Sequence, residues 1–179
     1  MKATGIVRRI DDLGRVVVPK EIRRTLRIRE GDPLEIFTDK EGEIILKKYS
    51  PMGELSNIVK DLCQAVAKVS QCNVVVCDRD TIIAVGNSQV KELHDMPISM
   101  DLKHLMEERV RYDVKEQKQK YYVGDNKVGE IALAYPILSS GDVTGCVIFL
   151  EDSEKKGSSE LARKFADMLV LFLGNQLES

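Results

Sequence analysis

The sequence predicts two domains, a small β-rich unit with one short helix and a larger α+β domain built on an antiparallel sheet. Three observations favour this division. The chain has 179 residues, which suits one domain of about 130 residues and a smaller one. Residues 50–53, Ser-Pro-Met-Gly, have the composition of a linker. Short strand-like runs precede this segment and longer helical stripes follow it, so we expect domains at residues 1–50 and 56–179, joined by a linker at residues 51–55.

The N-terminal unit begins with a predicted strand, a turn, a second strand and a helix. Residues 4–10 are mostly β-compatible, and Asp-Asp-Leu-Gly at residues 11–14 has turn chemistry. Residues 16–18 are three β-branched valines, which favour a second short strand. Pro19 suits the first turn of a helix, because its missing N–H has no helical partner there, and residues 20–26 are good helix formers.

A β-hairpin completes this predicted unit. Gly31 ends the helix, and residues 33–39 and 43–48 are predicted strands on either side of the turn Asp-Lys-Glu-Gly, so that the unit closes near Tyr49. Four short strands and a two-turn helix in about 48 residues bury too little apolar surface to be stable alone. Because the sequence offers no metal site or disulfide to add stability, we expect an obligate dimer.

The second domain is predicted from longer apolar patterns. Apolar residues recur at helical spacing over residues 55–69 and again over residues 161–172. The other predicted elements are strands at 73–77 and 81–85, a helix at 100–110, strands at 130–138 and 143–150, and a final helix capped by Ser158 or Ser159. This order is typical of an α+β domain in which helices flank an antiparallel sheet.

Composition excludes several classes of protein. No apolar run approaches the ~18 residues that span a bilayer, and the N-terminus has no signal-peptide core, so we expect a cytoplasmic protein with no membrane partner. The histidines do not lie at zinc-ligand spacing from any cysteine, and the cysteines form no CxxC pair. We therefore predict no disulfide, no metal and no cofactor.

The net charge of −2 conceals a strong asymmetry between the two ends of the chain. Residues 1–29 contain nine basic and three acidic residues and carry +6, so that the remaining residues carry −8. A basic N-terminal segment followed by an acidic remainder indicates that the N-terminal segment binds an anionic partner.

The predicted helix concentrates this charge on one face. At about 100° per residue, its basic side chains share an arc of about 100° and are Lys20, Arg23, Arg24 and Arg27. Ile22 and Leu26 lie on the opposite side and can dock on a core. Arginine suits bidentate contact with phosphate or guanine. A solvated basic face is the alternative, but Arg8, Arg9 and Arg15 add cations with no evident acidic partner, and dimerisation doubles the patch.

The N-terminal sequence resembles a known family. The segments TGIVRRIDDLGRVVVPKEIRRTLRIREGDPLEIF and GEIILKKY are similar to the DNA-binding domain of the AbrB-type transition-state regulators. The resemblance implies a swapped-hairpin β-barrel dimer that binds double-stranded promoter DNA and both activates and represses sporulation genes. It implies principal DNA contacts at Arg8, Arg15, Arg23 and Arg24. It also implies secondary phosphate contacts at Lys2, Arg9 and Lys20.

With a second domain of this length, the chain resembles those regulators of this kind whose C-terminal half is a GAF domain. The predicted order of elements in the second domain is compatible with a GAF domain. GAF domains often hold a small molecule between the sheet and its covering helices, but no motif here identifies a ligand. The apolar stripes at residues 55–69 and 161–172 cover the domain's own sheet, pack on the same helices of a second copy, or do both. The second arrangement predicts a homotetramer.

Two other functions fit the sequence less well than DNA-binding regulation. Swapped-hairpin domains also occur in antitoxins that bind DNA and neutralise a toxin through an extended C-terminal tail, whereas residues 54–179 have the periodicity of a packed domain. An enzyme has little support, because neither His94 nor His104 has a plausible nucleophilic partner and the carboxylates are scattered. We therefore predict a non-enzymatic regulator.

Overall fold

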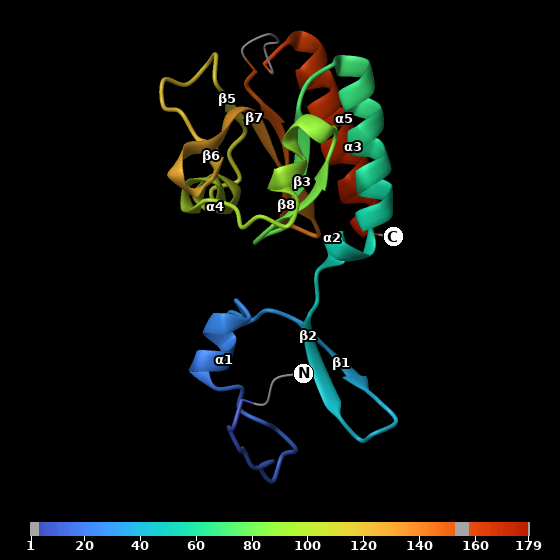
Figure 1. Ribbon diagram of the computed structural model, residues 1–179, viewed down its shortest axis with the longest axis vertical. Coiled ribbons are helices and arrows are strands. Elements are labelled where there is room, and N and C mark those ends of the chain that lie inside the picture. The colour runs from blue at the N-terminus through green and yellow to red at the C-terminus, as the bar shows by residue number, and fades with distance from the viewer. Residues whose placement is uncertain (1–3, 153–157, 179) are drawn as a thin grey trace. The chain divides into compact units, whose positions relative to one another are not determined.

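The computed structural model describes residues 4–152 and 158–178, and the chain divides into two compact units, Met1–Tyr49 and Ser50–Ser179 (Figure 1). The first unit contains the helix α1 (Lys20–Thr25) and a hairpin of the strands β1 (Leu34–Thr38) and β2 (Ile44–Lys48). β1 and β2 are antiparallel, in agreement with the predicted hairpin. Gly42 in their turn has a φ of 84°, a left-handed conformation that glycine adopts without strain.

Residues 4–18 form no strand, although two strands were predicted there. The predicted turn between them is present, since the N–H of Asp11 donates to the carbonyl of Arg15 (3.1 Å) and the N–H of Gly14 donates to the carbonyl of Asp11 (3.0 Å). A strand needs a neighbour that pairs with its backbone groups, and within the described part of one chain this segment has none. Local chemistry therefore forms the turn but not the strands.

The first unit of a single chain has no apolar core. Among residues 4–49, the only buried residue is Pro19. Large apolar side chains are instead exposed to solvent on every segment of the unit, including Val7 at 86%, Val17 at 71% and Ile36 at 67%. So much exposed apolar surface in so small a unit indicates that another chain covers it.

The second unit confirms the predicted α+β architecture, an antiparallel sheet flanked by helices (Figure 1). Its elements in chain order are α2 (Pro51–Glu54), α3 (Ser56–Ser70), β3 (Val74–Cys77), β4 (Ile82–Val85), η1 (Ser88–Leu93), α4 (Met100–Glu107), β5 (Tyr112–Asp113), β6 (Tyr122–Gly124), η2 (Asp125–Lys127), β7 (Val128–Ser139), β8 (Asp142–Leu150) and α5 (Glu160–Leu177). The sheet order is β4-β3-β8-β7-β5, and β6 also pairs with β7.

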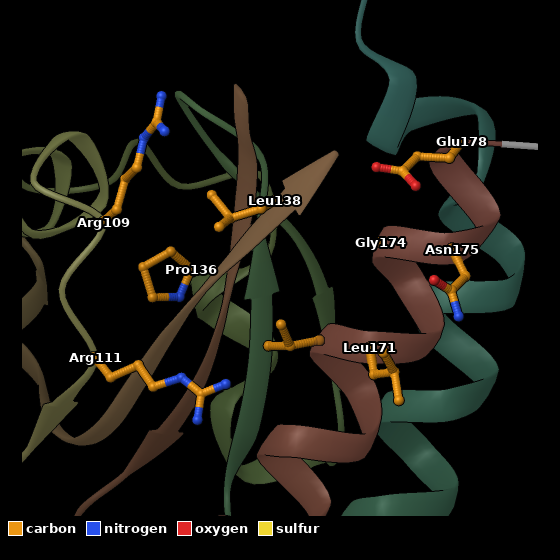
Figure 2. Close-up of a pocket in the computed structure, with 9 residues that line it drawn as sticks. Arg109, Arg111, Pro136, Leu138, Leu171, Gly174, Asn175 and Glu178 are labelled. Carbon is orange, nitrogen blue, oxygen red and sulfur yellow. The ribbon is translucent and has the colours of Figure 1, made fainter. Parts of the chain in front are cut away.

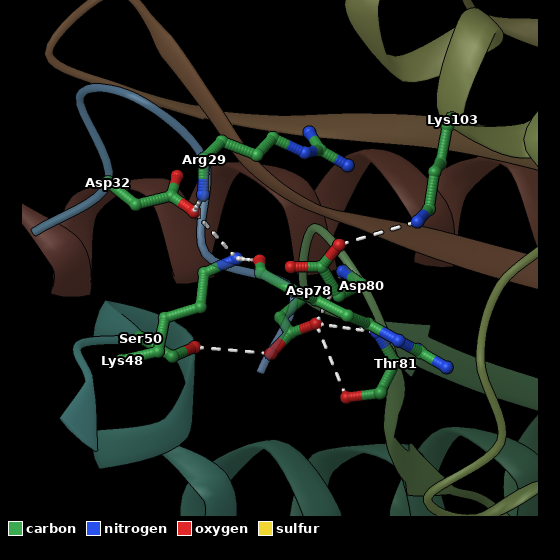
Figure 3. Close-up of polar contacts among 9 residues, drawn as sticks. Arg29, Asp32, Lys48, Ser50, Asp78, Asp80, Thr81 and Lys103 are labelled. Atoms are coloured by element: carbon green, nitrogen blue, oxygen red, sulfur yellow. Dashed lines mark hydrogen bonds and ion pairs between the residues drawn. The ribbon is translucent and has the colours of Figure 1, made fainter. Parts of the chain in front are cut away.

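Residues 51–54, predicted as part of a linker, are helical and belong to the second unit. The Ser50 hydroxyl accepts the N–H of Gly53 (3.2 Å) and caps α2, and Pro51 occupies its first turn. Met52 is fully buried in the core of the second unit. Ser50 also donates to the carboxylate of Asp78 (3.3 Å) in the β3–β4 turn, as Figure 3 shows. The amino-acid composition of this segment is typical of a linker, and composition alone does not reveal these tertiary contacts.

Pro136 lies inside β7, opposite Cys146 of β8. On the other side of β7, the pairing with β5 ends at Ala134. Proline has no N–H with which to extend that ladder by a further pair, so Pro136 limits β5 to two residues and leaves an open edge beyond it.

Apolar side chains cover both faces of the sheet. One core lies between the sheet and the helices α3 and α5, and the other lies between the sheet, η1 and α4. Figure 1 shows α3 and α5 side by side. The predicted stripes are only partly buried, however, because Ile58 (41% exposed) and Val69 (65%) on α3 point away from this core.

A buried ion pair fixes the last helix to the sheet. Asp113 of β5 accepts from Arg163 Nε (2.6 Å) and from the Ser158 hydroxyl (2.5 Å). Burial opposes ionisation of this carboxyl, but these hydrogen bonds hold the pKa of Asp113 below its ordinary value. Ser159 accepts the N–H of Ala162 (3.1 Å) and is therefore the cap of α5.

No helix in the described ranges is long and apolar enough to cross a membrane. The four cysteines are reduced and buried, and they are Cys63, Cys72, Cys77 and Cys146. Burial raises the pKa of the Cys63 thiol to about 12, so this thiol stays protonated at neutral pH.

Candidate nucleic-acid interface

The basic helix α1 is shorter than the predicted one. Pro19 is its buried N-cap rather than a residue of its first turn, and the N–H of Arg23 bonds to the Pro19 carbonyl (2.9 Å). At the other end, Arg27 has a left-handed φ of 53° and the N–H of Ile28 reaches back to the carbonyl of Arg23 (2.8 Å). Arg27 therefore lies beyond the helix, so the prediction that it shares the basic arc was wrong.

The two predicted contacts on α1 differ in exposure. Arg24 is exposed, whereas Arg23 is half-buried, and its Nε is buried without a hydrogen-bond partner among the described residues. A buried N–H without an acceptor costs free energy that a bound acceptor would recover. Ile22 is half-buried as predicted, but Leu26 is 51% exposed because the single chain supplies no core for it to contact.

Arg15 is held at the tip of the first turn by Asp11. One oxygen of the Asp11 carboxylate accepts the N–H groups of Leu13 (3.0 Å) and Arg15 (2.7 Å), and the other accepts Arg15 Nε (2.8 Å). The backbone and side-chain hydrogen bonds from Arg15 hold the pKa of Asp11 below its ordinary value. The expectation that no acid neutralises Arg15 was therefore wrong. The pair is exposed and restricts the direction of the guanidinium more than it stabilises the fold.

The remaining predicted basic residues are distributed along the N-terminal segment. Arg8 and Arg9 are exposed in the extended residues before the turn, and Lys20 is exposed at the start of α1. Lys2 lies outside the described residues. A single chain thus places Arg23 and Arg24 on one helix. Arg15 lies at a separate turn, and Arg8 lies in the residues before that turn.

Lys48 and Asp32 connect the basic helix to the hairpin, which the sequence did not reveal. Lys48 Nζ of β2 lies 3.0 Å from Asp32 Oδ2 and 3.1 Å from the carbonyl of Arg27. The same Asp32 oxygen accepts the N–H of Arg29 (2.8 Å), and Figure 3 shows Asp32 between Arg29 and Lys48. The Asp32 side chain is only 6% exposed, so this contact fixes the segment that follows α1.

The β1–β2 turn gathers three carboxylates, those of Asp39, Glu41 and the half-buried Glu43, whose oxygens lie within 4.8 Å of one another. Asp39 Oδ1 accepts the N–H groups of Glu41 (3.0 Å) and Glu43 (2.8 Å). These bonds are those of a turn and account for the position of Asp39 without an ion.

Two families match the chain. Residues 54–178 match the family described as Stage V sporulation protein T C-terminal, transcription factor. Residues 7–54 match the family described as Antidote-toxin recognition MazE, bacterial antitoxin.

Two relatives from Bacillus subtilis strain 168 and one solved structure are similar to this chain. Stage V sporulation protein T is 46% identical over 181 residues, which cover 99% of each protein. The transition state regulatory protein AbrB is 54% identical over 74 residues, or 41% of this chain and 68% of AbrB. The GAF domain/HD domain protein from Geobacter sulfurreducens is 17% identical, with a TM-score of 0.49, over 73% of this chain and 96% of that one.

Proposed function

Because this chain belongs to the stage V sporulation protein T family, we propose that it is a cytoplasmic transcription factor that activates and represses sporulation genes by binding their promoters. Similarity to the Bacillus protein extends over both units, and the family that matches residues 54–178 is described as a transcription factor. The observation that carries the proposal is the strong positive charge of residues 1–29, whose arginines lie on a helix and a turn of a unit that lacks its own core.

We assign the principal DNA contacts to Arg8, Arg15, Arg23 and Arg24. The Arg15 side chain is 69% exposed and its guanidinium is oriented by Asp11, and Arg24 is exposed on α1. The unpartnered Nε of Arg23 is a donor in need of an acceptor, which a phosphate oxygen or a base edge supplies. If most of these contacts are to phosphates, the protein binds DNA of many base sequences, and the shape of the duplex supplies the selectivity.

Dimerisation of the first unit is part of the same proposal. The apolar side chains of residues 4–49 are too exposed for a stable monomer, and the segment 4–18 has unpaired backbone that a second copy can pair with. Two copies related by a two-fold axis place eight arginines on one assembly, which suits the pseudo-symmetry of duplex DNA.

The experiment compares DNA affinity and its salt dependence in four single arginine-to-alanine variants and in the double variant of Arg23 and Arg24. Removal of two contacts from each of two chains should reduce the slope of log K against log salt by about 3 to 4, because each phosphate contact contributes about 0.9. Lys40→Ala is the control, since it removes one exposed charge from the β1–β2 turn of the same unit. Unchanged slopes in the double variant would refute the assignment.

We also propose that the second units associate to give a tetramer. Exposed apolar side chains lie on one side of α3 and on one side of α5, and on α5 they are Leu161, Met168 and Phe172. These side chains can pack on the same helices of another dimer. Met168→Lys should convert a tetramer to a dimer in sedimentation velocity, whereas Val128→Lys, at a similarly exposed apolar residue at the start of β7, should not. A tetramer that persists in Met168→Lys contradicts this arrangement.

The antitoxin function is less well supported. Residues 7–54 match an antitoxin family, but such proteins hold their toxin with an extended tail, and residues 54–178 form a packed domain that matches a transcription-factor family. In the regulator, the second unit instead serves assembly and the sensing of a small molecule.

A further inference from the structure

A groove lies in the second unit beside the outer edge of β4, at the end of this strand near Val85. One wall is α3, where Lys60 and Gln64 lie one helical turn apart, and the other wall carries Lys91 of η1 and His94. The half-buried Val85, at the end of β4, forms part of its floor. The groove has a volume of about 510 Å³, which is in the range of sites that hold a ligand the size of a metabolite.

Gly86 brings the first wall against the floor. Its N–H bonds to the carbonyl of Val74 (2.8 Å), and a Cβ at this position would lie 2.6 Å from the Ala67 Cβ and 2.8 Å from the Cys63 carbonyl oxygen. α3 therefore packs directly on the backbone of this segment. The groove is preformed, because its wall and floor are both part of the packed core.

The groove carries unbalanced positive charge. Lys60 and Lys91 are exposed on opposite walls, and the ammonium group of neither forms a hydrogen bond or ion pair with any residue in the described ranges. His94 lies on the same side as Lys91, with its Nδ1 3.0 Å from the carboxylate of Asp95. Of the described residues, those that line the groove include no acidic one. An anion between the two lysines would therefore be attracted from both walls.

The edge of β4 adds directional hydrogen-bonding groups. Ala84 of β4 pairs with Val76 of β3, and two residues further on the N–H of Gly86 also bonds to β3. Backbone groups alternate in direction along a strand, so the N–H and carbonyl of Val85, which lies between these two residues, point away from β3. Within the described chain, no backbone bond from outside the ladder reaches Val85. The Asn87 amide is fixed in place, donating to Asn73 Oδ1 (2.6 Å) and accepting the N–H of Gln89 (3.1 Å).

A second pocket differs in that two of its three charged groups take part in contacts that hold the fold. Figure 2 shows this pocket of about 220 Å³ between β7 and α5, lined by Arg109 and Arg111 on one side and Glu178 on the other. Arg111 donates to Asp167 (2.8 Å), and Glu178 accepts the backbone N–H of Ser140 (2.7 Å). Both groups are engaged in contacts that hold the fold, unlike the lysines of the β4 groove.

We propose that the β4 groove binds a small molecule bearing a carboxylate or phosphate group, held between Lys60 and Lys91, with its remaining polar atoms against the Val85 edge. This deepens the sensing role proposed for the second unit. At about 100° per residue, Ile58 and Val69 lie roughly opposite Lys60 on α3. The ligand thus binds away from the apolar side of α3 that we assign to assembly, and both can be occupied together.

The experiment titrates the full chain with inorganic phosphate and with succinate, against sodium chloride at equal ionic strength. Backbone amide chemical shifts of Val85, Asn87 and Lys91 report on the groove. The test variant is Lys60→Met/Lys91→Met, which keeps most of each side chain and removes its charge. Lys68→Met, an exposed lysine elsewhere on α3, is the control, and thermal unfolding verifies that each variant is folded.

Saturable shifts with phosphate, succinate or both in the wild type and in Lys68→Met, weakened roughly threefold to tenfold in the double variant, support the site. The anion that saturates identifies the recognised group. Shifts that only follow ionic strength, that appear elsewhere, or that persist unchanged in the double variant overturn it. DNA affinity of the same variants, measured without added ligand, should match that of the wild type. A loss there would count against the proposed DNA interface at residues 1–50 and not against the groove.

Discussion

Substitution of Gly86 by alanine tests whether α3 is packed against β4 as tightly as the geometry indicates. The added Cβ would lie 2.6 Å from the Ala67 Cβ, 2.8 Å from the Cys63 carbonyl oxygen and 3.1 Å from the Val74 carbonyl oxygen. Carbon atoms in contact prefer separations of about 3.5–4.0 Å, so α3 must move by roughly 1 Å. Ala67 and Cys63 are buried in the core, which cannot shift without opening gaps elsewhere.

Overpacking of this kind costs about 1–3 kcal/mol, partly offset by the reduced entropy of the unfolded chain, worth about 0.4–1 kcal/mol for glycine to alanine. For a unit of this size, a net loss of about 1.5 kcal/mol lowers the melting temperature by roughly 5 °C. Circular dichroism of thermal unfolding measures the change. Gly53→Ala is the matched control, because its nearest neighbour is 3.4 Å away and helix propensity favours alanine in α2. A melting temperature of Gly86→Ala equal to the wild type would refute the reasoning.

Two further predictions concern carboxylates. Asp113→Asn should destabilise the second unit by about 1.5–3 kcal/mol at pH 7, because it weakens charge-assisted bonds to Arg163 and Ser158. The pKa of Asp113 is lowered by folding, so this stabilisation is complete above the unfolded value of about 3.9 and disappears as the pH falls through the folded value. The stabilities of the two proteins in urea unfolding should converge as the pH falls below about 3.9, and a constant difference would contradict the linkage. Asp11→Ala, which removes the acceptors for Leu13 and Arg15, should weaken DNA binding relative to Asp11→Asn, which retains one of them. Equal affinities of the two variants in fluorescence anisotropy would exclude a positioning role for Asp11.

Local sequence signals predicted much of the first unit. The turn at residues 11–14, the helix from Lys20 and the hairpin of β1 and β2 all depend on residues within a few positions of one another, and all are present. The predicted strands before and after the first turn are absent because their partners lie outside the single chain. The departure of Arg27 from the basic face has a similar cause, since the point at which α1 ends depends on tertiary contacts such as that of Lys48 with the Arg27 carbonyl.

The second unit was predictable where apolar runs were long. β3, β7 and β8 are buried on both faces, so their residues are apolar almost without interruption and indicate strands directly. The helical stripes predicted α3 and α5 but not how much of each stripe the protein buries, because periodicity does not distinguish a domain's own core from a second copy. Val69 shows the difference, since it belongs to the stripe and yet is mostly exposed.

The sequence by itself determined most of the helices and the longer strands, the basic N-terminal segment and the residue types suited to DNA, because periodicity, turn chemistry and charge are properties of neighbouring residues. Only the tertiary structure decided which of those residues meet. It joined Asp113 to Arg163 across 50 positions, and brought Lys60 and Lys91 to opposite walls of one groove. It also paired Arg15 with an acid four residues away. Contacts of this kind depend on how the chain packs in three dimensions, and spacing along the chain does not record that packing.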